Sequence, residues 1–271
     1  MEPMYHTINL FGLDFISARN HEVFLEQLID YRNQPNYKQK LPFVITPNAD
    51  QVIKLDNPQK RTLKEQLSQA LFILPDGESI ILFSRLIRKP LQARLTGSDL
   101  FPLLWQHAKQ QREKILVIVS EESVGMKLKE DYEDIIYYTP PFFQAKSVEF
   151  NKICTDNFNL INKFNPKYVI IGVGFPKQEF LGLALYTKLQ AAGMDSPLFL
   201  FLGASAEFYV GIKKRAPRFL QKLGLEWLHR LLLEPRRMWR RYLLGMVPLF
   251  FLYIKEFRKE LVKTKSVATP K

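Results

Sequence analysis

The sequence contains one cysteine, Cys154, among its 271 residues. A single cysteine excludes an intramolecular disulfide and a zinc site built from several cysteines, and it fits a reducing cytoplasm. The four histidines are scattered without an HxH or HExxH spacing, so a metal site built by the protein is not expected. The sequence also lacks the GxGxxG and GxxxxGKS/T patterns, which leaves a dinucleotide-binding or P-loop site without support.

The sequence has no apolar run long enough to cross a bilayer. The longest candidate, Tyr242–Ile254, has 13 residues and is interrupted by Pro248, whereas a spanning helix needs roughly 18–20. The first twelve residues carry neither the basic nor the apolar segment of a secretory signal, so none is expected. We therefore expect any membrane association to be peripheral, on the cytoplasmic face.

The net charge of +12 is confined to the end of the chain. Residues 213–271 contain 16 Lys and Arg against 4 Asp and Glu, while residues 1–212 contain 23 of each. The basic segment also carries Trp227, Trp239 and the apolar run at Tyr242–Ile254. Basic and apolar residues that alternate in this way suit a surface of acidic lipids, to which each Lys or Arg contributes roughly 1 kcal/mol.

Two other interpretations of the basic segment exist. A charged run is often only a solvated helix face, and it can also bind nucleic acid. The long apolar stretch argues against nucleic acid, because it offers neither a polar nor a stacking face. The pattern therefore favours an anionic membrane surface as the partner, with no nucleic acid.

The rest of the chain has the composition of a globular protein, with 46% hydrophobic and 24% charged residues. Short apolar runs alternate with helix-period stretches, which predicts an α/β fold. The expected strands are Phe43–Thr46, Leu71–Leu74, Ile115–Ser120, Ile135–Thr139, Tyr168–Val173 and Leu198–Leu202. The expected helices lie near 48–69, 77–89, 98–112, 122–131, 147–164 and 176–192.

This alternation predicts a Rossmann-like, mostly parallel sheet flanked by helices. We expect residues 1–212 to form this core and residues 213–271 to form a basic, amphipathic helical appendage that associates with a membrane. The boundary falls near 210–225, where charge and aromatic content change.

Polar turns follow four of the expected strands. Ligands of parallel sheets bind beyond the carboxyl ends of the strands, so these turns are candidates for one site. Each turn could instead be only a helix cap, because Asn, Asp and Ser commonly cap helices. The turns are Pro47–Gln51, Pro75–Gly77, Gly174–Glu179 and Gly203–Glu207.

Several stretches together resemble the WecG/TagA/CpsF glycosyltransferase family (glycosyltransferase family 26). They cover roughly residues 40–245 and stand in the family's order, and the PKQE turn and the block that begins GLEWL are the most specific. The stretches are TPNADQV (46–52), LPDG (74–77), RLTGSDL (94–100), GFPKQE (174–179), GASAEFYVGIKKRAP (203–217) and GLEWLHRLLLEPRRMWRRY (224–242).

The resemblance implies a membrane-associated, inverting transferase. Such enzymes move a sugar from a UDP-sugar donor to a polyprenyl-diphosphate-linked sugar acceptor in bacterial surface-polysaccharide synthesis. Well-known members transfer N-acetylmannosamine or its uronic acid, and other relatives add glucose during exopolysaccharide assembly. The family is read as metal-independent, and this sequence has no DxD motif, so we expect no cofactor.

Inversion at an anomeric carbon needs a base to take the proton of the attacking hydroxyl. Asp76 matches the family's proposed base, and the alternative is that it only caps the following helix. Thr46 and Asn48 match the motif beside the donor. The amide of Gln178 could pair with the uracil edge or a sugar hydroxyl. Lys177 is either a phosphate contact or a surface charge.

The charge that develops on the leaving diphosphate must be stabilised by a metal, by arginine or by backbone N–H groups. Because the sequence has no DxD motif and the resemblance implies metal independence, we expect arginine and lysine to stabilise it. Arg94 lies in a family motif, where either a ligand contact or pairing with Asp99 is expected. Arg230, Arg237 and Arg241 fall on one helical stripe if the helix continues through Pro235, which could instead start a new helix. In either case they could clamp the lipid diphosphate.

Two positions depart from the pattern of the N-acetylmannosaminyl members. Glu207 replaces an aspartate common in relatives, and Glu78-Ser79-Ile80 follows Asp76-Gly77 where many relatives have a small or apolar pair. Both could touch the donor sugar, so glucose remains an alternative donor sugar. A UDP-sugar-binding protein without catalytic activity, or a basic nucleic-acid-binding protein, are the remaining alternatives.

Overall fold

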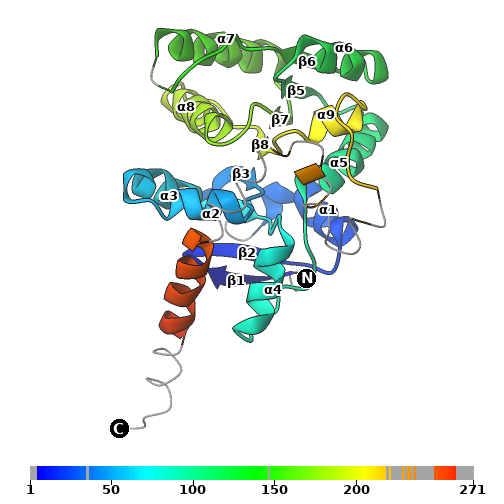
Figure 1. Ribbon diagram of the computed structural model, residues 1–271. Helices are drawn as coiled ribbons and strands as arrows, with labels where there is room; N and C mark the ends of the chain where they lie inside the picture. Colours follow the sequence, from blue (N-terminus) through cyan, green and yellow to red (C-terminus); the bar gives the residue numbers. More distant parts are fainter. Residues whose placement is uncertain are drawn as a thin grey trace.

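The computed structural model describes residues 5–34, 37–145, 147–217, 220, 228, 231–232, 235 and 247–260. They form an eight-stranded sheet with helices on both faces and a C-terminal helix over 247–260 (Figure 1). The predicted α/β class with a mostly parallel sheet is confirmed. The strands are β1 (His6–Leu10), β2 (Leu13–Ser17), β3 (Leu41–Ile45), β4 (Ala70–Ile73), β5 (Ile115–Ile118), β6 (Ile135–Tyr138), β7 (Tyr168–Ile171) and β8 (Leu198–Phe201).

The strand order is β1-β2-β4-β3-β8-β7-β5-β6. Every pair from β2 to β6 is parallel, and β1 alone runs antiparallel, against β2. All residues of β4, β5, β7 and β8 are buried. A parallel strand that is buried on both faces has a continuous run of apolar residues in its sequence. For this reason the six predicted strands are found, each within two residues of its expected ends.

The hairpin of β1 and β2 was missed by the sequence analysis. Its two-residue turn is Phe11–Gly12, with φ of 58° and 76°, and Leu10 pairs with Leu13. Positive φ at both turn residues is the geometry that matches the twist of a tight hairpin, and it favours glycine. The hairpin extends the sheet by two strands beyond β4.

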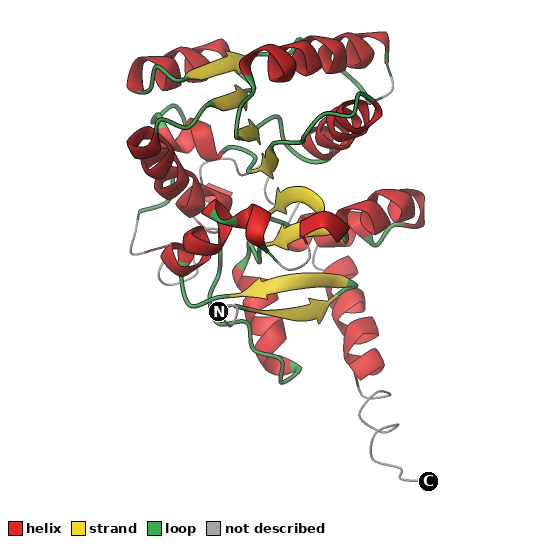
Figure 2. Cartoon of the chain, turned by 180° about the vertical axis from the view of Figure 1, so that it is seen from behind, coloured by secondary structure: helices red, strands yellow, loops and turns green. Residues whose placement is uncertain are grey.

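The helices cover both faces of the sheet, as the view from behind also shows (Figure 2). The apolar side chains on one face pack with α2, α3, α4, α7 and α8, and those on the other with α1, α5, α6 and α9. The helices are α1 (His21–Ile29), α2 (Ala49–Leu55), α3 (Arg61–Leu67), α4 (Glu78–Leu86), α5 (Gly97–Gln111), α6 (Glu122–Asp131), α7 (Val148–Phe164), α8 (Lys177–Ala191) and α9 (Ser205–Tyr209).

The helix-period stretch near 48–69 is not one helix. It divides into α2, a 3₁₀ turn at Pro58–Lys60, and α3. Pro58 has no backbone N–H and disfavours a helical conformation at Asn57, so the helix ends before it. Asn57 instead caps the 3₁₀ turn by accepting a hydrogen bond from the backbone N of Gln59 at 2.9 Å.

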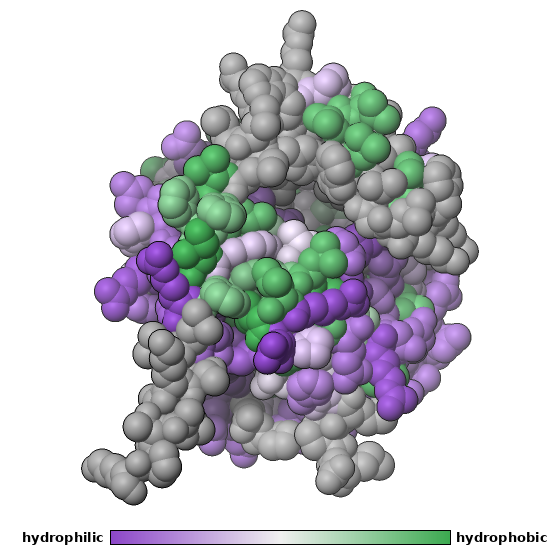
Figure 3. Space-filling view, turned by 60° about the horizontal axis from the view of Figure 1, so that its bottom comes forward, coloured by the Kyte–Doolittle hydropathy of each residue, from purple (hydrophilic) through white to green (hydrophobic). Residues whose placement is uncertain are grey.

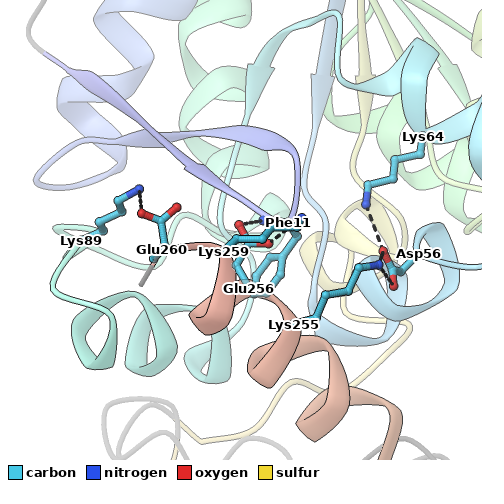
Figure 4. Close-up of polar contacts among 8 residues, drawn as sticks. All are labelled: Phe11, Asp56, Lys64, Lys89, Lys255, Glu256, Lys259 and Glu260. Carbon is cyan, nitrogen blue, oxygen red and sulfur yellow. Dashed lines mark hydrogen bonds and ion pairs between the residues drawn. The ribbon is translucent and has the colours of Figure 1, made fainter. Parts of the chain in front are cut away.

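Polar contacts attach the helix over 247–260 to the core (Figure 4). The side chain of Glu256 is buried, and its Oε1 accepts a hydrogen bond from the backbone N of Phe11 at 3.0 Å. Lys255 pairs with Asp56 at the end of α2, at 2.9 Å. Lys89, just beyond α4, pairs with Glu260 at 2.5 Å. These contacts join the C-terminal helix to three separate parts of the core.

Aromatic stacking adds an apolar attachment at the same place. The ring of Tyr253 stacks on Phe83 of α4 with centroids 4.0 Å apart, and on Phe11 at 5.7 Å. Its hydroxyl donates to the backbone O of Ser79 at 2.9 Å. Each helix that the structure describes is too short or too polar to span a bilayer.

Candidate active site

The polar turns lie beyond adjacent strands, because β4, β3, β8 and β7 are neighbours in the sheet. Hydrogen bonds connect each turn to the next. The backbone N of Asp76 donates to the O of Pro47 at 3.3 Å, and Thr46 Oγ1 donates to the O of Phe201 at 3.3 Å. The backbone N of Gly203 donates to Gln178 Oε1 at 3.2 Å. The four turns therefore form one connected rim at the carboxyl edge of the sheet.

Asp76 lies between the end of β4 and the start of α4, and it is partly buried. The N-cap of α4 is Gly77, with φ of 157° and no side-chain cap. A side-chain carbon added at Gly77 would lie 3.8 Å from both the Cβ of Asn48 and the N of Ala49. The turn thus sits against the N-terminus of α2, and Asp76 does not occupy the capping position that was its alternative role.

Asn48 does act as a helix cap. Its Oδ1 accepts from the backbone N of Gln51 at 3.2 Å, and Gln51 Oε1 accepts from the N of Asn48 at 3.0 Å. This reciprocal capping box satisfies two donors at the start of α2. The cap uses the amide oxygen of Asn48.

Gln178 is buried in the first turn of α8 and bridges two chain segments. Its Nε2 donates to Glu179 Oε1 at 2.9 Å, while its Oε1 accepts from Gly203. The other carboxylate oxygen, Glu179 Oε2, is buried without a hydrogen-bond partner. Burial raises the pKa of Glu179 to about 7, and the bond from Gln178 opposes this only in part. Glu179 fixes the orientation of the Gln178 amide, a role that the sequence analysis did not assign.

Replacing Glu179 by glutamine should flatten the pH dependence of stability. The folded-state pKa lies above the ordinary value, so the stability linked to this group is complete below about pH 4.5 and is lost as pH rises through about 7. Between about pH 5.5 and about pH 8 we expect the wild type to lose about 2 kcal/mol more than Glu179→Gln. Urea unfolding at the two pH values measures this, and equal losses in both proteins would contradict it.

The side chain of Lys177, at the start of α8, packs against aromatic rings. Its Nζ lies over two aromatic rings, 4.2 Å from the centroid of Phe142 and 5.0 Å from that of Phe143. The rings attract the ammonium through their electron-rich faces. They hold the charge beside the turn that carries Gln178.

Glu207 is buried on α9, and its carboxylate is engaged on both oxygens. The hydroxyl of Ser120, which follows β5, donates to Oε1, and Lys213 pairs with Oε2. Glu207 therefore connects the end of β5 to the segment after α9. Ser120 was not among the predicted site residues.

Arg94 lies before α5 and is partly buried. Asp99 of the same stretch forms an ion pair with Arg215, through bonds of 2.5 and 3.0 Å. Burial alone would raise the pKa of Asp99, but the bonds from Arg215 and Thr96 outweigh it and lower the pKa to about 2. Arg215 belongs to the GASAEFYVGIKKRAP stretch, a signal that could have identified it.

Three predicted acceptor residues, Arg230, Arg237 and Arg241, lie outside the residues that the structure describes. In the described part of the chain, no group of three or more His, Cys, Asp or Glu side chains is arranged to hold a metal ion.

Comparison with known proteins matches the chain to one family and to proteins that share one name. Residues 8–263 match the profile of the Glycosyl transferase WecG/TagA/CpsF family. The chain is 32% identical over 207 residues to an N-acetylglucosaminyldiphosphoundecaprenol N-acetyl-β-D-mannosaminyltransferase of Bacillus spizizenii, covering 74% of each chain. It is 24% identical over 263 residues to a protein of the same name from Staphylococcus aureus strain MRSA252, covering 95% of this chain and 96% of the relative.

Proposed function

Because the chain belongs to the WecG/TagA/CpsF glycosyltransferase family, we propose that it transfers a hexose from a UDP-sugar to a polyprenyl-diphosphate-linked sugar, with inversion. The product would enter a bacterial cell-surface polysaccharide. The observation that carries this proposal is the place of Asp76, a carboxylate at the end of β4 on the rim that four adjacent strand ends form.

In this reaction the acceptor hydroxyl oxygen forms a bond to the anomeric carbon while the bond from that carbon to the UDP oxygen breaks. Asp76 takes the hydroxyl proton, and UDP leaves with the bonding electrons. Thr46, Asn48 and Gln178 orient the donor. Glu179 holds the Gln178 amide in place at 2.9 Å. Lys177, Arg94 and the arginines Arg230, Arg237 and Arg241 supply positive charge to the two diphosphates.

The donor sugar is proposed to be of the N-acetylmannosamine type, as the names of the relatives state for those proteins. Glu207 keeps glucose as an alternative, because its longer side chain stands where many family members have aspartate. In the structure the Glu207 carboxylate bonds Ser120 and Lys213. It would therefore contact the donor sugar while it also bonds these two residues.

We propose that the protein works on the cytoplasmic face of the membrane, to which the basic segment 213–271 attaches it. The described helix of this segment supports the proposal. Its Tyr253 and Glu256 face the core, while Val247, Phe250 and Phe251 are exposed. An amphipathic helix of this kind lies in the interface rather than across the bilayer.

A panel of UDP-sugars tests the proposed function. The purified protein is incubated with each donor and with polyprenyl-diphosphate-linked N-acetylglucosamine, and the product mass is read. One added hexose or N-acetylhexosamine from one donor is the expected result. Hydrolysis or binding without a glycosylated product would contradict it.

Turnover should survive EDTA. The sequence has no DxD motif to bind a divalent ion with the diphosphate, and lysine and arginine lie in the turns that match the family. We expect equal initial rates with EDTA and with added Mg²⁺. Loss of turnover in EDTA that Mg²⁺ or Mn²⁺ restores would show that this expectation is wrong.

A further inference from the structure

The core helix α4 exposes two large apolar side chains to solvent. Leu82 is 56% exposed and Leu86 is 71% exposed, although both belong to a helix whose other side is buried against the sheet. They are four residues apart, so they lie on one face of the helix. Both leucines lie outside the basic segment 213–271, to which the membrane attachment was assigned.

A second exposed apolar face lies on the neighbouring helix over 247–260. Phe250 is 63% exposed, Phe251 is 64% exposed, and Val247 and Phe257 are also exposed. The buried residues Leu252 and Glu256 lie on the opposite side of this helix. Val247, Phe250 and Phe257 recur at helical spacing with the partly buried Ile254 between them, and Phe251 lies beside Phe250, so the exposed apolar side chains form a stripe.

The two exposed faces belong to one surface. Tyr253 contacts Ser79 at the start of α4, and Glu260 pairs with Lys89 just after its end. The two helices therefore run beside each other in the same direction (Figure 1). At this end of the molecule, apolar residues gather among hydrophilic ones (Figure 3). We call the exposed apolar residues of both helices the two-helix face: Leu82, Leu86, Val247, Phe250, Phe251 and Phe257.

Basic side chains border the two-helix face. Arg85 and Arg88 are exposed beside Leu82 and Leu86, and Arg258 is exposed beside Phe257. Apolar side chains bordered by one sign of charge match an anionic bilayer, whose acyl chains receive the apolar groups and whose phosphates meet the cations.

We propose that α4 is a second membrane contact, and that the two-helix face as a whole binds the surface of an anionic phospholipid bilayer. This inference rests on the proposed function, since it concerns how the same enzyme meets its lipid-linked acceptor. Asp76 lies two residues before α4. Contact through α4 therefore places the proposed base beside the bilayer surface, where the acceptor head group is held.

Vesicle binding by full-length variants tests the contact. Leu82→Ser with Leu86→Ser should bind vesicles of phosphatidylcholine and phosphatidylglycerol roughly tenfold more weakly than the wild type. Met126→Ser with Val148→Ser is the matched control, because these residues are also exposed apolar positions, 51% and 80% exposed, on α6 and α7. The control should bind like the wild type. Arg85→Gln with Arg88→Gln should weaken binding to these vesicles and reduce its dependence on salt.

A second measurement separates this inference from the proposed function. With a detergent-solubilised acceptor, the Leu82→Ser, Leu86→Ser protein should keep the wild-type rate, while transfer to an acceptor in vesicles should fall. Wild-type vesicle binding by this variant would overturn the membrane contact. A wild-type dimer that this variant converts to monomers, with vesicle binding unchanged, would overturn it in favour of a protein interface. If the wild type transfers no sugar in detergent, the proposed function fails while the vesicle result still stands.

Discussion

Replacing Asp76 by asparagine should reduce sugar transfer by roughly 10²–10⁴-fold, the usual contribution of a general base. The amide has nearly the shape of the carboxylate but does not accept the proton of the attacking hydroxyl. Asp76 is not the N-cap of α4, which is Gly77, so we expect little change in folding. Initial rates with the donor identified from the panel measure the effect.

Two controls accompany this variant. Affinity for UDP should stay close to that of the wild type, because UDP carries no sugar for the base to act on. Asn48→Asp is a useful comparison, since it keeps a side chain that caps α2 while changing a neighbouring polar group on the rim. An Asp76→Asn protein that keeps more than about a third of wild-type turnover would remove Asp76 from the role of base.

Replacing Tyr253 by alanine should lower the free energy of unfolding by about 2–3 kcal/mol. The change removes the ring stacked on Phe83 at 4.0 Å and the hydrogen bond to Ser79 at 2.9 Å. Phe257→Ala is the matched control on the same helix, and because Phe257 is exposed it should change stability by less than about 0.5 kcal/mol. Urea unfolding midpoints of the two variants make the comparison.

Tyr253→Phe divides the effect between its two parts. It keeps the stacked ring and loses the hydroxyl, so the expected loss is about 1 kcal/mol. Equal stability of Tyr253→Ala and the wild type would mean that the stacked ring and the hydroxyl of Tyr253 contribute nothing to the free energy of unfolding.

The parallel part of the sheet was predictable because its strands are buried on both faces. Ile115–Ile118 and Leu198–Phe201 consist of apolar residues alone, and such runs stand out in any sequence. The β1–β2 hairpin carries a weaker signal. Thr7 and Asn9 are exposed while Ile8 and Leu10 are buried, so the alternation is present, but it covers only a few residues around an uncommon Phe-Gly turn.

The candidate site was predictable to the level of the turns but not of the contacts. Sequence order alone places Asp76, Gln178 and Glu207 after their strands. The pairing of Asp99 with Arg215 joins residues 116 positions apart, and the packing of α5 and the segment after α9 decides it. The low-dielectric surroundings of Glu179 likewise form only when the core assembles. The raised pKa of Glu179 therefore could not be predicted from the PKQE motif alone.

The C-terminal helix shows the same limit of sequence reasoning. Its apolar residues predicted a membrane-binding surface. The helical periodicity of the sequence could have divided these apolar residues between two faces of the helix. Nothing local in the sequence identifies the core side of Tyr253 and Glu256, because their partners, Phe83 and Phe11, are far away along the chain.

The bond between Glu256 and Phe11 also sets an order of events during biosynthesis. The two residues are 245 positions apart, so at a synthesis rate of 5–20 residues per second the hairpin turn waits about 12–50 s for its partner to be made. Until then the ring of Phe11 lacks the cover of Tyr253. A nascent chain on the ribosome can thus assemble the sheet, but the surface formed by α4 and the helix over 247–260 is complete only once residue 260 has emerged.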